Sequence, residues 1–286
     1  MKLNLNILTA LFMSLWIVTP SVAQQSEVDP VQHITTQQWH LSLNLGLGVM
    51  SNPLKGGDNL PLLVIPEVAY YGDKFFFDNG RLGYSLHQDP SHIFNIVTEF
   101  NPETRFFVDW HPSNIFALTS TSSSFTNNEN ELKNQQPRLD ITELDKRKWA
   151  LDAGFGYHYI YHQHVFSVQA LADVSGVYEG WRTAIQWQMH HAIGELKIKP
   201  SIGVWYKSAQ LNSYFYGVTE KESRNHAIEV GSSWQPYAKI DARWPLNEGN
   251  SLRFHLAYYD YSALDDSPLF EQTYSMTAFI GFDHTF

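Results

Sequence analysis

Residues 39–49 read WHLSLNLGLGV, and this stretch decides the fold class. Every odd position from Trp39 to Val49 is apolar, and the positions between them are polar or glycine. In a strand, successive side chains point to opposite faces, so a period of two indicates a β-strand with one apolar and one polar or small face. The stretch therefore predicts a sheet whose two faces meet different surroundings.

The same alternation returns along the rest of the chain, most clearly in 166–173, 196–204, 251–258 and 274–286. No stretch after residue 23 shows a convincing helical period. Assigning strands backwards from the C-terminus predicts about twelve, with ten as the alternative number. The expected strands are 38–50, 60–71, 74–87, 91–100, 105–118, 147–159, 164–174, 180–190, 195–207, 227–245, 251–261 and 272–286.

The N-terminal residues have the layout of a secretory signal peptide. Lys2 is followed by an apolar run from Leu8 to Val18, and small residues stand at Ser21-Val22-Ala23. The run is shorter than the roughly 20 residues that a transmembrane helix needs. We therefore expect residues 1–23 to be cleaved, residues 24–38 to form a periplasmic N-terminal segment, and residues 39–286 to form one domain.

Composition excludes several classes of protein. The chain has 29 acidic and 19 basic residues, with no basic stripe, so we expect no nucleic-acid partner. The absence of cysteine excludes a disulfide scaffold and a thiolate metal site. An aromatic content of 15% argues against disorder. A mean hydropathy of −0.29 is compatible with a transmembrane barrel, because the polar side chains of its lumen lower the average.

Two all-β architectures fit the alternation: a secreted β-sandwich and a transmembrane β-barrel. The barrel is favoured because short and long connections alternate, as periplasmic turns and external loops do. Tyrosine and tryptophan pairs stand at strand ends, as at Tyr70-Tyr71 and Trp205-Tyr206, and the chain closes on Phe286, where barrels carry their assembly signal. The sequence therefore predicts an antiparallel up-and-down barrel surrounded by outer-membrane lipid, with both ends periplasmic and with the polar loops near 119–146, 208–226 and 262–271 outside.

Several segments resemble the MltA-interacting protein (MipA)/OmpV family of outer-membrane proteins, and the similarity spans the chain after residue 23. One residue departs mildly from the family pattern: Phe215 stands where tyrosine is usual. The segments are Asn52-Pro53 with Gly56-Gly57-Asp58, Asp173-Val174-Ser175-Gly176 with Gly180, Asn212-Ser213-Tyr214 with Tyr216-Gly217, and Asp266-Ser267-Pro268.

The resemblance implies a Gram-negative outer-membrane barrel without enzymatic activity and without a cofactor. In the namesake members of the family, the barrel is a scaffold that joins a murein-cleaving lytic transglycosylase to a murein synthase in peptidoglycan synthesis. Other members are described as major outer-membrane or surface proteins. The scaffold role is therefore the first hypothesis, and a passive diffusion pore or a surface-exposed protein is the alternative.

Two groups of residues are candidates for a metal site or an active site. His158, His162 and His164 flank one predicted turn and His190-His191 flank the next, but their spacing matches no zinc signature. His111-Pro112-Ser113-Asn114 is the one local set for a lipid-modifying barrel enzyme, and the proline indicates a strand-end kink instead. We therefore assign no catalytic, cofactor or metal residues.

The scaffold hypothesis requires a periplasmic contact surface. The expected surface consists of 24–38, the Phe286 carboxylate and the short turns at Gly72-Asp73, Asn101–Thr104, Tyr161–His164, His191–Glu195 and Asn247–Asn250. The lumen is expected to mix both charge signs. Its inward residues are predicted to include Lys197, Lys199, Arg253, Gln169, Asp173 and Asp283.

Overall fold

The computed structural model describes residues 36–108, 138–223 and 227–286. The chain divides into two units, Met1–Pro30 and Val31–Phe286, and every described residue belongs to the second. The predicted signal peptide, most of the predicted segment 24–38 and the residues His111–Asn114 lie outside the described residues, so these hypotheses stay predictions.

Antiparallel pairing joins each strand to its neighbours until the sheet closes on itself. β13 pairs with β1, and β10 pairs with β8 and β9 along one edge and with β11 along the other. β9 continues the line of β8 beyond His190, so twelve strands surround the lumen. The strands are β1 (Trp39–Met50), β2 (Leu60–Tyr71), β3 (Phe75–Asp78), β4 (Arg81–Gln88), β5 (His92–Phe100), β6 (Leu151–Tyr161), β7 (His164–Asp173), β8 (Trp181–Met189), β9 (His191–Ile193), β10 (Leu196–Lys207), β11 (Ser233–Asn247), β12 (Asn250–Asp260) and β13 (Tyr274–Thr285).

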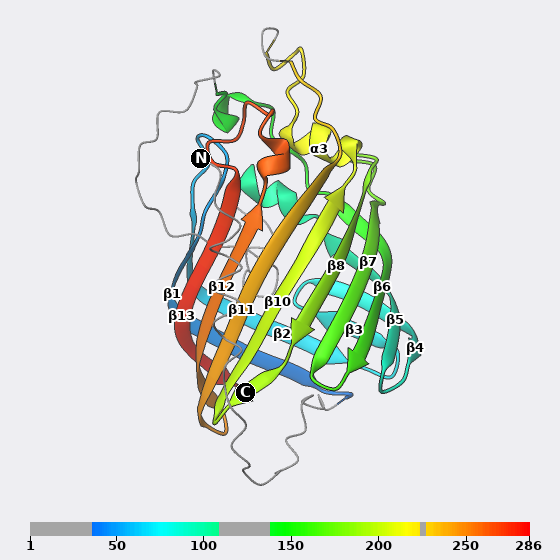
Figure 1. Ribbon diagram of the computed structural model, residues 1–286, viewed down its shortest axis with the longest axis vertical. Coiled ribbons are helices and arrows are strands. Elements are labelled where there is room, and N and C mark those ends of the chain that lie inside the picture. Colours follow the sequence, from blue (N-terminus) through cyan, green and yellow to red (C-terminus); the bar gives the residue numbers. More distant parts are fainter. Residues whose placement is uncertain (1–35, 109–137, 224–226) are drawn as a thin grey trace, which may run out of the picture. The chain divides into compact units, whose positions relative to one another are not determined.

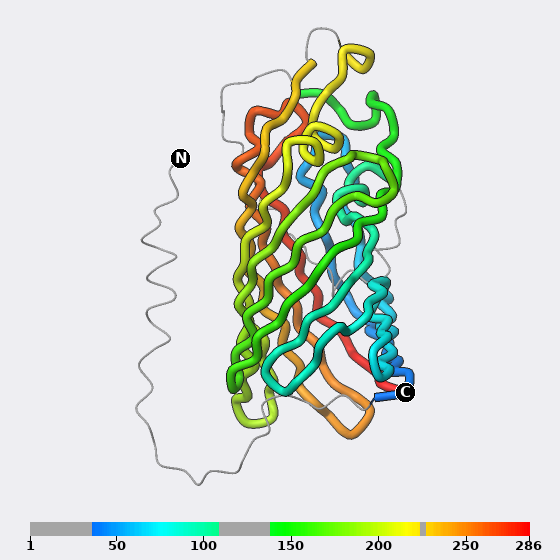
Figure 2. The backbone as a smooth tube through the Cα atoms, turned by 90° about the vertical axis from the view of Figure 1, so that its right-hand side faces the viewer, coloured from blue at the N-terminus to red at the C-terminus, as the bar shows by residue number. Residues whose placement is uncertain are grey.

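The predicted fold class is confirmed: the described chain is an antiparallel β-barrel of twelve strands. Its helical pieces are short and lie in the loops. They are α3 (Ala209–Tyr216) and the 3₁₀ turns η2 (Pro102–Phe106), η3 (Ile141–Glu143) and η4 (Ser262–Leu264). None of these described helices is long and apolar enough to cross a bilayer. Figure 1 shows α3 at the end of the barrel opposite to the C-terminus, and Figure 2 shows the tilt of the strands.

The alternation seen in the sequence corresponds to the two surfaces of the wall. Leu45 and Leu47 of β1 are exposed on the outside, and Ile280 and Phe282 of the neighbouring β13 are exposed beside them. The side chains that alternate with these residues point inward, and polar ones such as Asn44 are buried. Lipid surrounds the apolar outer face, because only a closed barrel or a helix satisfies its own backbone hydrogen bonds in hydrocarbon.

Glycines allow one aromatic ring to pack flat on the inner wall. A Cβ atom on Gly46 would stand 2.2 Å from the carbonyl oxygen of Ile280 and 2.8 Å from the ring of Phe279. A Cβ atom on Gly281 would stand 2.5 Å from the same ring. Phe279 is 3% exposed and packs with Met50, Leu62 and Ile65 in a small apolar cluster inside the barrel. The two alternating strands therefore carry glycine where the wall must admit a ring.

Two predicted strands were wrong, although the total was right. The predicted strand 74–87 is a hairpin, because Asn79 and Gly80 both have positive φ (49° and 88°) and form a two-residue turn between β3 and β4. Asn-Gly is the preferred pair for such a turn. The described start of the predicted strand 105–118 is not a strand: Arg105 and Phe106 belong to η2, and β5 pairs directly with β6. Residues 109–118 lie outside the described residues.

The Asn79-Gly80 turn yields a prediction about stability. Gly80→Val should lower the free energy of unfolding by about 1–2 kcal/mol, because a side chain other than glycine is strained at positive φ. Urea unfolding of the barrel refolded in lipid vesicles, followed by tryptophan fluorescence, measures this difference. Gly231→Ala is the control, since its Cβ would meet nothing within 4 Å. Equal midpoints for the two variants would contradict the turn assignment.

Candidate functional site

The external mouth of the barrel is closed by an apolar core built from loops. Leu211, Phe215 and Tyr216 of α3 are buried without measurable exposure. They belong to one cluster with residues from the other loops of that end. These residues include Leu54, Phe106, Tyr178, Tyr261, Leu264, Leu269 and Phe270. We call this set the mouth core.

Local chemistry places α3 across the mouth. The Ser208 side chain caps its first turn by accepting a hydrogen bond from the Leu211 backbone N–H at 3.3 Å. Gly180 of the β7–β8 loop lies against this cap, and a Cβ there would stand 2.5 Å from Ser208 Oγ. The helix ends at Tyr216 and is followed by Gly217. A Cβ atom on Gly217 would stand only 2.4 Å from the Ser213 carbonyl oxygen, so glycine fits this position.

Asn212, Ser213 and Tyr214, which carry the family resemblance, tie α3 to other loops. Asn212 Nδ2 donates to the carbonyl oxygen of Gly231 at 2.7 Å, and Ser213 Oγ donates to that of Val230 at 2.8 Å. Tyr214 accepts a hydrogen bond from the Lys148 backbone N–H at 2.8 Å. The sequence-predicted motif positions of this segment thus have structural partners within the mouth.

The other predicted motif positions lie at the same end. Asn52 Nδ2 donates to the carbonyl oxygen of Phe106 at 2.9 Å, and the carbonyl oxygen of Pro53 accepts from Glu271. Gly56 has φ of +79° and lies against the Asp140 side chain, while Gly57 packs against Asn52. Asp58 is exposed.

Two further segments of the resemblance fasten loops. Asp173 accepts hydrogen bonds from Ser175, Tyr178 and Glu179, with Gly176 at the positive φ of the turn. Asp173 therefore holds the β7–β8 loop, whereas the sequence predicted it among the lumen charges. In the β12–β13 loop, Ser267 Oγ donates to the Tyr216 carbonyl oxygen at 2.6 Å and the Pro268 carbonyl oxygen accepts from Leu139. Asp266 is exposed.

A buried ion pair lies directly under the mouth core. Lys207 Nζ is 2.7 Å from Glu103 Oε1, and both side chains are about 95% buried. The Tyr216 hydroxyl donates a hydrogen bond to the other carboxylate oxygen of Glu103. Burial acts to raise the pKa of Glu103, but the Lys207 ammonium and these hydrogen bonds hold it below its usual range. The carboxylate thus joins η2, β10 and α3.

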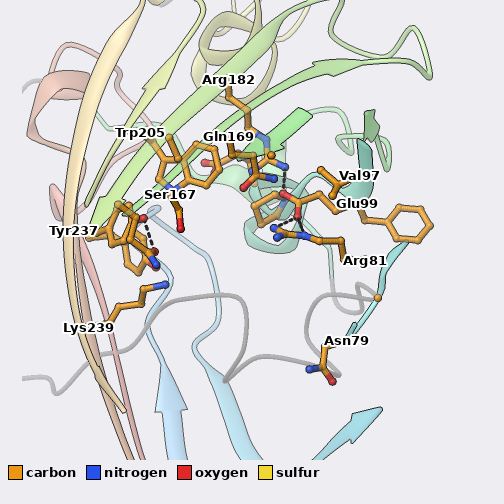
Figure 3. A pocket seen from close by; sticks show the side chains of 18 of the residues that line it. Asn79, Arg81, Val97, Glu99, Ser167, Gln169, Arg182, Trp205, Tyr237 and Lys239 are labelled. Atoms are coloured by element: carbon orange, nitrogen blue, oxygen red, sulfur yellow. Dashed lines mark hydrogen bonds and ion pairs between the residues drawn. The ribbon is translucent and has the colours of Figure 1, made fainter. Parts of the chain in front are cut away.

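A second network lies beside the first, near the external ends of β5, β6 and β8. Arg182, which is 1% exposed, lies between two carboxylates: its Nη2 is 2.6 Å from Glu99 and its Nε is 2.7 Å from Asp152. Arg81, on the neighbouring strand β4, also contacts Glu99, and Asp152 accepts a hydrogen bond from Tyr178 at 2.6 Å. Figure 3 shows Arg81, Glu99 and Arg182 meeting inside the cavity.

The periplasmic half of the lumen has a third network. Arg253 contacts Glu67 and lies 2.9 Å from Asp241, which also accepts from His255 at 3.0 Å. Arg243 is 3.4 Å from Asp283. The predicted inward orientation of Arg253 and Asp283 agrees with these contacts, and the predicted mixture of charge signs holds for the described lumen.

Between these networks lie two cavities. The inner one, about 330 Å³, extends from Phe106 and Tyr261 under the mouth core to Asp78. The outer one, about 360 Å³, lies towards the end that holds the C-terminus and is lined by residues such as His40, Lys197 and Lys199. Both are lined largely by polar side chains from different strands.

The predicted histidine group does not form a metal centre in the described part of the chain. There, no three histidine, aspartate or glutamate side chains are grouped to hold an ion. His158 hydrogen-bonds Ser167 at 2.8 Å inside the barrel, and the ring of His164 stacks on Trp187. These histidines have separate structural partners.

Sequence reasoning missed the residues that fill the lumen, because no motif marks them. Glu99, Asp152 and Arg182 stand at single inward positions of three strands. The one available signal was parity: each alternates with outward residues such as Phe100 or Trp181. Their meeting required the barrel register, which a sequence without strand pairing does not supply.

Relatives of known name match most of the chain. The outer membrane protein YiaT of Escherichia coli K12 is 25% identical over 84% of this chain and 89% of its own length. The MltA-interacting protein of the same organism is 26% identical over 86% and 90%. The outer membrane protein OmpV of Vibrio cholerae is 20% identical over 63% and 61%.

YiaT and OmpV are named outer-membrane proteins, and the described chain is a closed barrel with an apolar outer face, so the protein resides in the outer membrane. The model of one protein family, described as MltA-interacting protein MipA, matches residues 45–286. That match extends from residue 45, in the middle of β1, to the last residue, and it contains all the remaining strands. The chain therefore belongs to the MltA-interacting protein MipA family.

Proposed function

We propose that this non-enzymatic outer-membrane barrel is a scaffold that brings together a murein lytic transglycosylase and a murein synthase at the periplasmic surface. The relative that is named MltA-interacting protein supports a murein-cleaving partner. The observation that carries the proposal is the closed external mouth. The mouth core blocks the lumen at the external end. The periplasmic rim is therefore the surface on which such a barrel can bind proteins inside the envelope.

The periplasmic rim differs from the predicted one at one turn. Asn101–Thr104 lies at the external mouth, where Asn101 and Thr104 are fully buried. The error follows from the missed β3–β4 hairpin, which reverses the direction of β5. The turn Asp89–Ser91 takes its place on the rim, together with the turns at 72–74, 162–163, 194–195 and 248–249.

The start of the described chain is fastened to this rim. The Gln37 backbone N–H donates to the Tyr71 carbonyl oxygen at 2.6 Å, and Gln37 Nε2 donates to Asp73 at 2.7 Å. The described chain therefore begins beside the β2–β3 turn. The turns are short, whereas a standard interface needs about 800 Å² on each partner. We infer that residues 24–38 supply most of the partner contact and that the turns beside them complete it.

The alternative of a diffusion pore is less well supported. An open pore requires a continuous aqueous path, but Leu211, Phe215 and Tyr216 lie across the external end with no exposure. Beneath them, the Lys207–Glu103 pair anchors η2 to the wall. A surface-exposed role for the loops is compatible with the same closed mouth and does not compete with the periplasmic proposal.

The scaffold proposal predicts selective loss of partner binding. The full mature chain in detergent should retain both purified murein enzymes in a pull-down, and a variant without residues 24–35 should retain much less. Lys221→Ala, on an exposed external loop, is the control and should bind normally. Full binding by the deletion variant would refute the assigned contact, and no binding by the intact chain would refute the scaffold itself.

The closed mouth predicts a non-conducting barrel. In planar bilayers the unaltered protein should show no sustained conductance, while Phe215→Asp should conduct, because a carboxylate cannot be buried in the mouth core without a partner. Gln210→Asp places the same residue on the exposed side of the same helix and should stay closed. Steady conductance of the unaltered protein would favour the pore.

The Glu103–Lys207 pair predicts how closure depends on pH. Because the folded pKa of Glu103 lies below its usual range, the pair is intact above that range and is lost only as the pH falls through the lowered pKa. The unaltered barrel should therefore stay closed from pH 7 to pH 5. Glu103→Ala leaves Lys207 buried without its partner and should cost about 3–5 kcal/mol of mouth stability. Opening of the unaltered barrel between pH 7 and pH 5 would contradict this role of the pair.

A further inference from the structure

We propose that the inner wall formed by β10, β11 and β12 binds a small anion that carries a carboxylate or phosphate group and enters from the periplasmic side. The proposal is independent of the scaffold role, since it concerns the lumen and not the rim. It rests on three lysines that have no ion-pair partner among the described residues, and on buried donors that line the same cavity as one of them.

The three lysines follow one another along the inner wall. Lys197 and Lys199 lie on β10, and Ser201, two residues further, is directly opposite Lys239 on β11. We call Lys197, Lys199 and Lys239 the lysine row. It begins at the periplasmic end, in the outer cavity, and reaches the inner cavity at Lys239. Among the described residues, no carboxylate lies within 4.0 Å of any of these three ammonium groups.

The carboxylates near the lysine row already have partners. Asp241, opposite Lys199 in the strand register, binds Arg253 and His255. Glu67 contacts Arg253 and lies 3.5 Å from Arg243. Across the inner cavity, the carboxylates of Glu99 and Glu103 bind Arg182 and Lys207. The lysine row is therefore positive charge that the described lumen does not neutralise within contact distance, which favours an anionic ligand.

Buried hydrogen-bond donors lie in the inner cavity beside Lys239. Tyr259 is 6% exposed and its hydroxyl has no hydrogen-bond partner among the described residues. Gln169 Nε2 is likewise buried without one. Both residues line the same cavity as Lys239. A buried donor without a partner costs about 1–3 kcal/mol, so an acceptor that reaches these groups would be stabilised.

The floor of this site is aromatic and fixed. Lys239 Nζ lies 5.1 Å from the centre of the Tyr237 ring, which stacks on Tyr259 with centroids 5.2 Å apart. The Tyr237 hydroxyl donates to Gln186 Oε1 at 2.8 Å, which fixes the orientation of the ring. Figure 3 shows Tyr237, Lys239 and Gln169 around the cavity. These contacts hold the Lys239 ammonium group and the Tyr259 hydroxyl on the same wall of the cavity, as an anion site requires.

The same observations define the size and route of the ligand. A cavity of about 330 Å³ admits a small solute and not a polymer. The mouth core blocks the external end, so the ligand passes the outer cavity first. There the exposed side chains of Lys197 and Lys199 would attract it, since positive charge at the entrance of a cleft raises the local concentration of anions.

Isothermal titration of the full mature chain, refolded in detergent, tests the site. The probes are citrate for carboxylates, pyrophosphate for phosphates and sucrose as a neutral polar solute, all at one ionic strength. We expect binding of citrate or pyrophosphate and none of sucrose. Lys239→Met should weaken the anion at least tenfold, as expected for loss of a hydrogen bond to a charged group, and Tyr259→Phe should weaken it severalfold.

Two controls keep the test decisive. Lys221→Met removes an exposed lysine outside the barrel and should leave affinity unchanged. The difference in electrophoretic mobility between unheated and heated samples verifies that each variant is folded. Failure of both anions to bind the folded, unaltered barrel would overturn the proposal. So would unchanged affinity in folded Lys197→Met, Lys199→Met and Lys239→Met variants. Binding of only one probe identifies the ligand group.

Discussion

Closure of the sheet is the constraint on which the rest of the structure depends. Hydrocarbon offers no hydrogen-bond partners, so each strand in the membrane must pair on both edges. β1 pairs with β13, and β10 pairs with β11, which completes the ring. Once the ring is closed, alternate side chains must face lipid or lumen. The apolar outer face and the polar lumen both follow from this single requirement.

A closed ring of this size has an interior that must be filled or left wet. In the described chain, the kind of side chain that fills the interior changes from the external end to the periplasmic end. The mouth core fills the external end with apolar side chains. One carboxylate–arginine network lies beneath it, near the external ends of β5, β6 and β8, and another lies in the periplasmic half. Loops from five different connections meet at the mouth, so its closure depends on contacts between residues far apart in sequence. Lys207–Glu103 joins residues 104 positions apart.

The fold was largely predictable because its signal is local. Alternation in residues 39–49 and at the C-terminus marks strands without any knowledge of their partners, and the alternation of short and long loops gives the topology. The β3–β4 hairpin was missed because Phe75–Asp78 is only four residues long, although Asn79-Gly80 marks a turn. The lumen site was not predictable in detail. Glu99 and Asp152 are opposite each other on the paired strands β5 and β6, and Arg182 reaches both from β8, so the three meet only through the strand register. In the sequence, each looks like an isolated polar residue.

The central claim is that the lumen is closed to the outside and accessible from the periplasm. The chain has no cysteine, so Gln186→Cys, in the inner cavity, gives a single site for thiol labelling. A maleimide too large for general porins should leave this cysteine unlabelled in intact cells and a smaller, periplasm-permeant maleimide should label it. Lys221→Cys on the external loop should react with both reagents. Labelling of Gln186→Cys by the large reagent in intact cells would contradict the account.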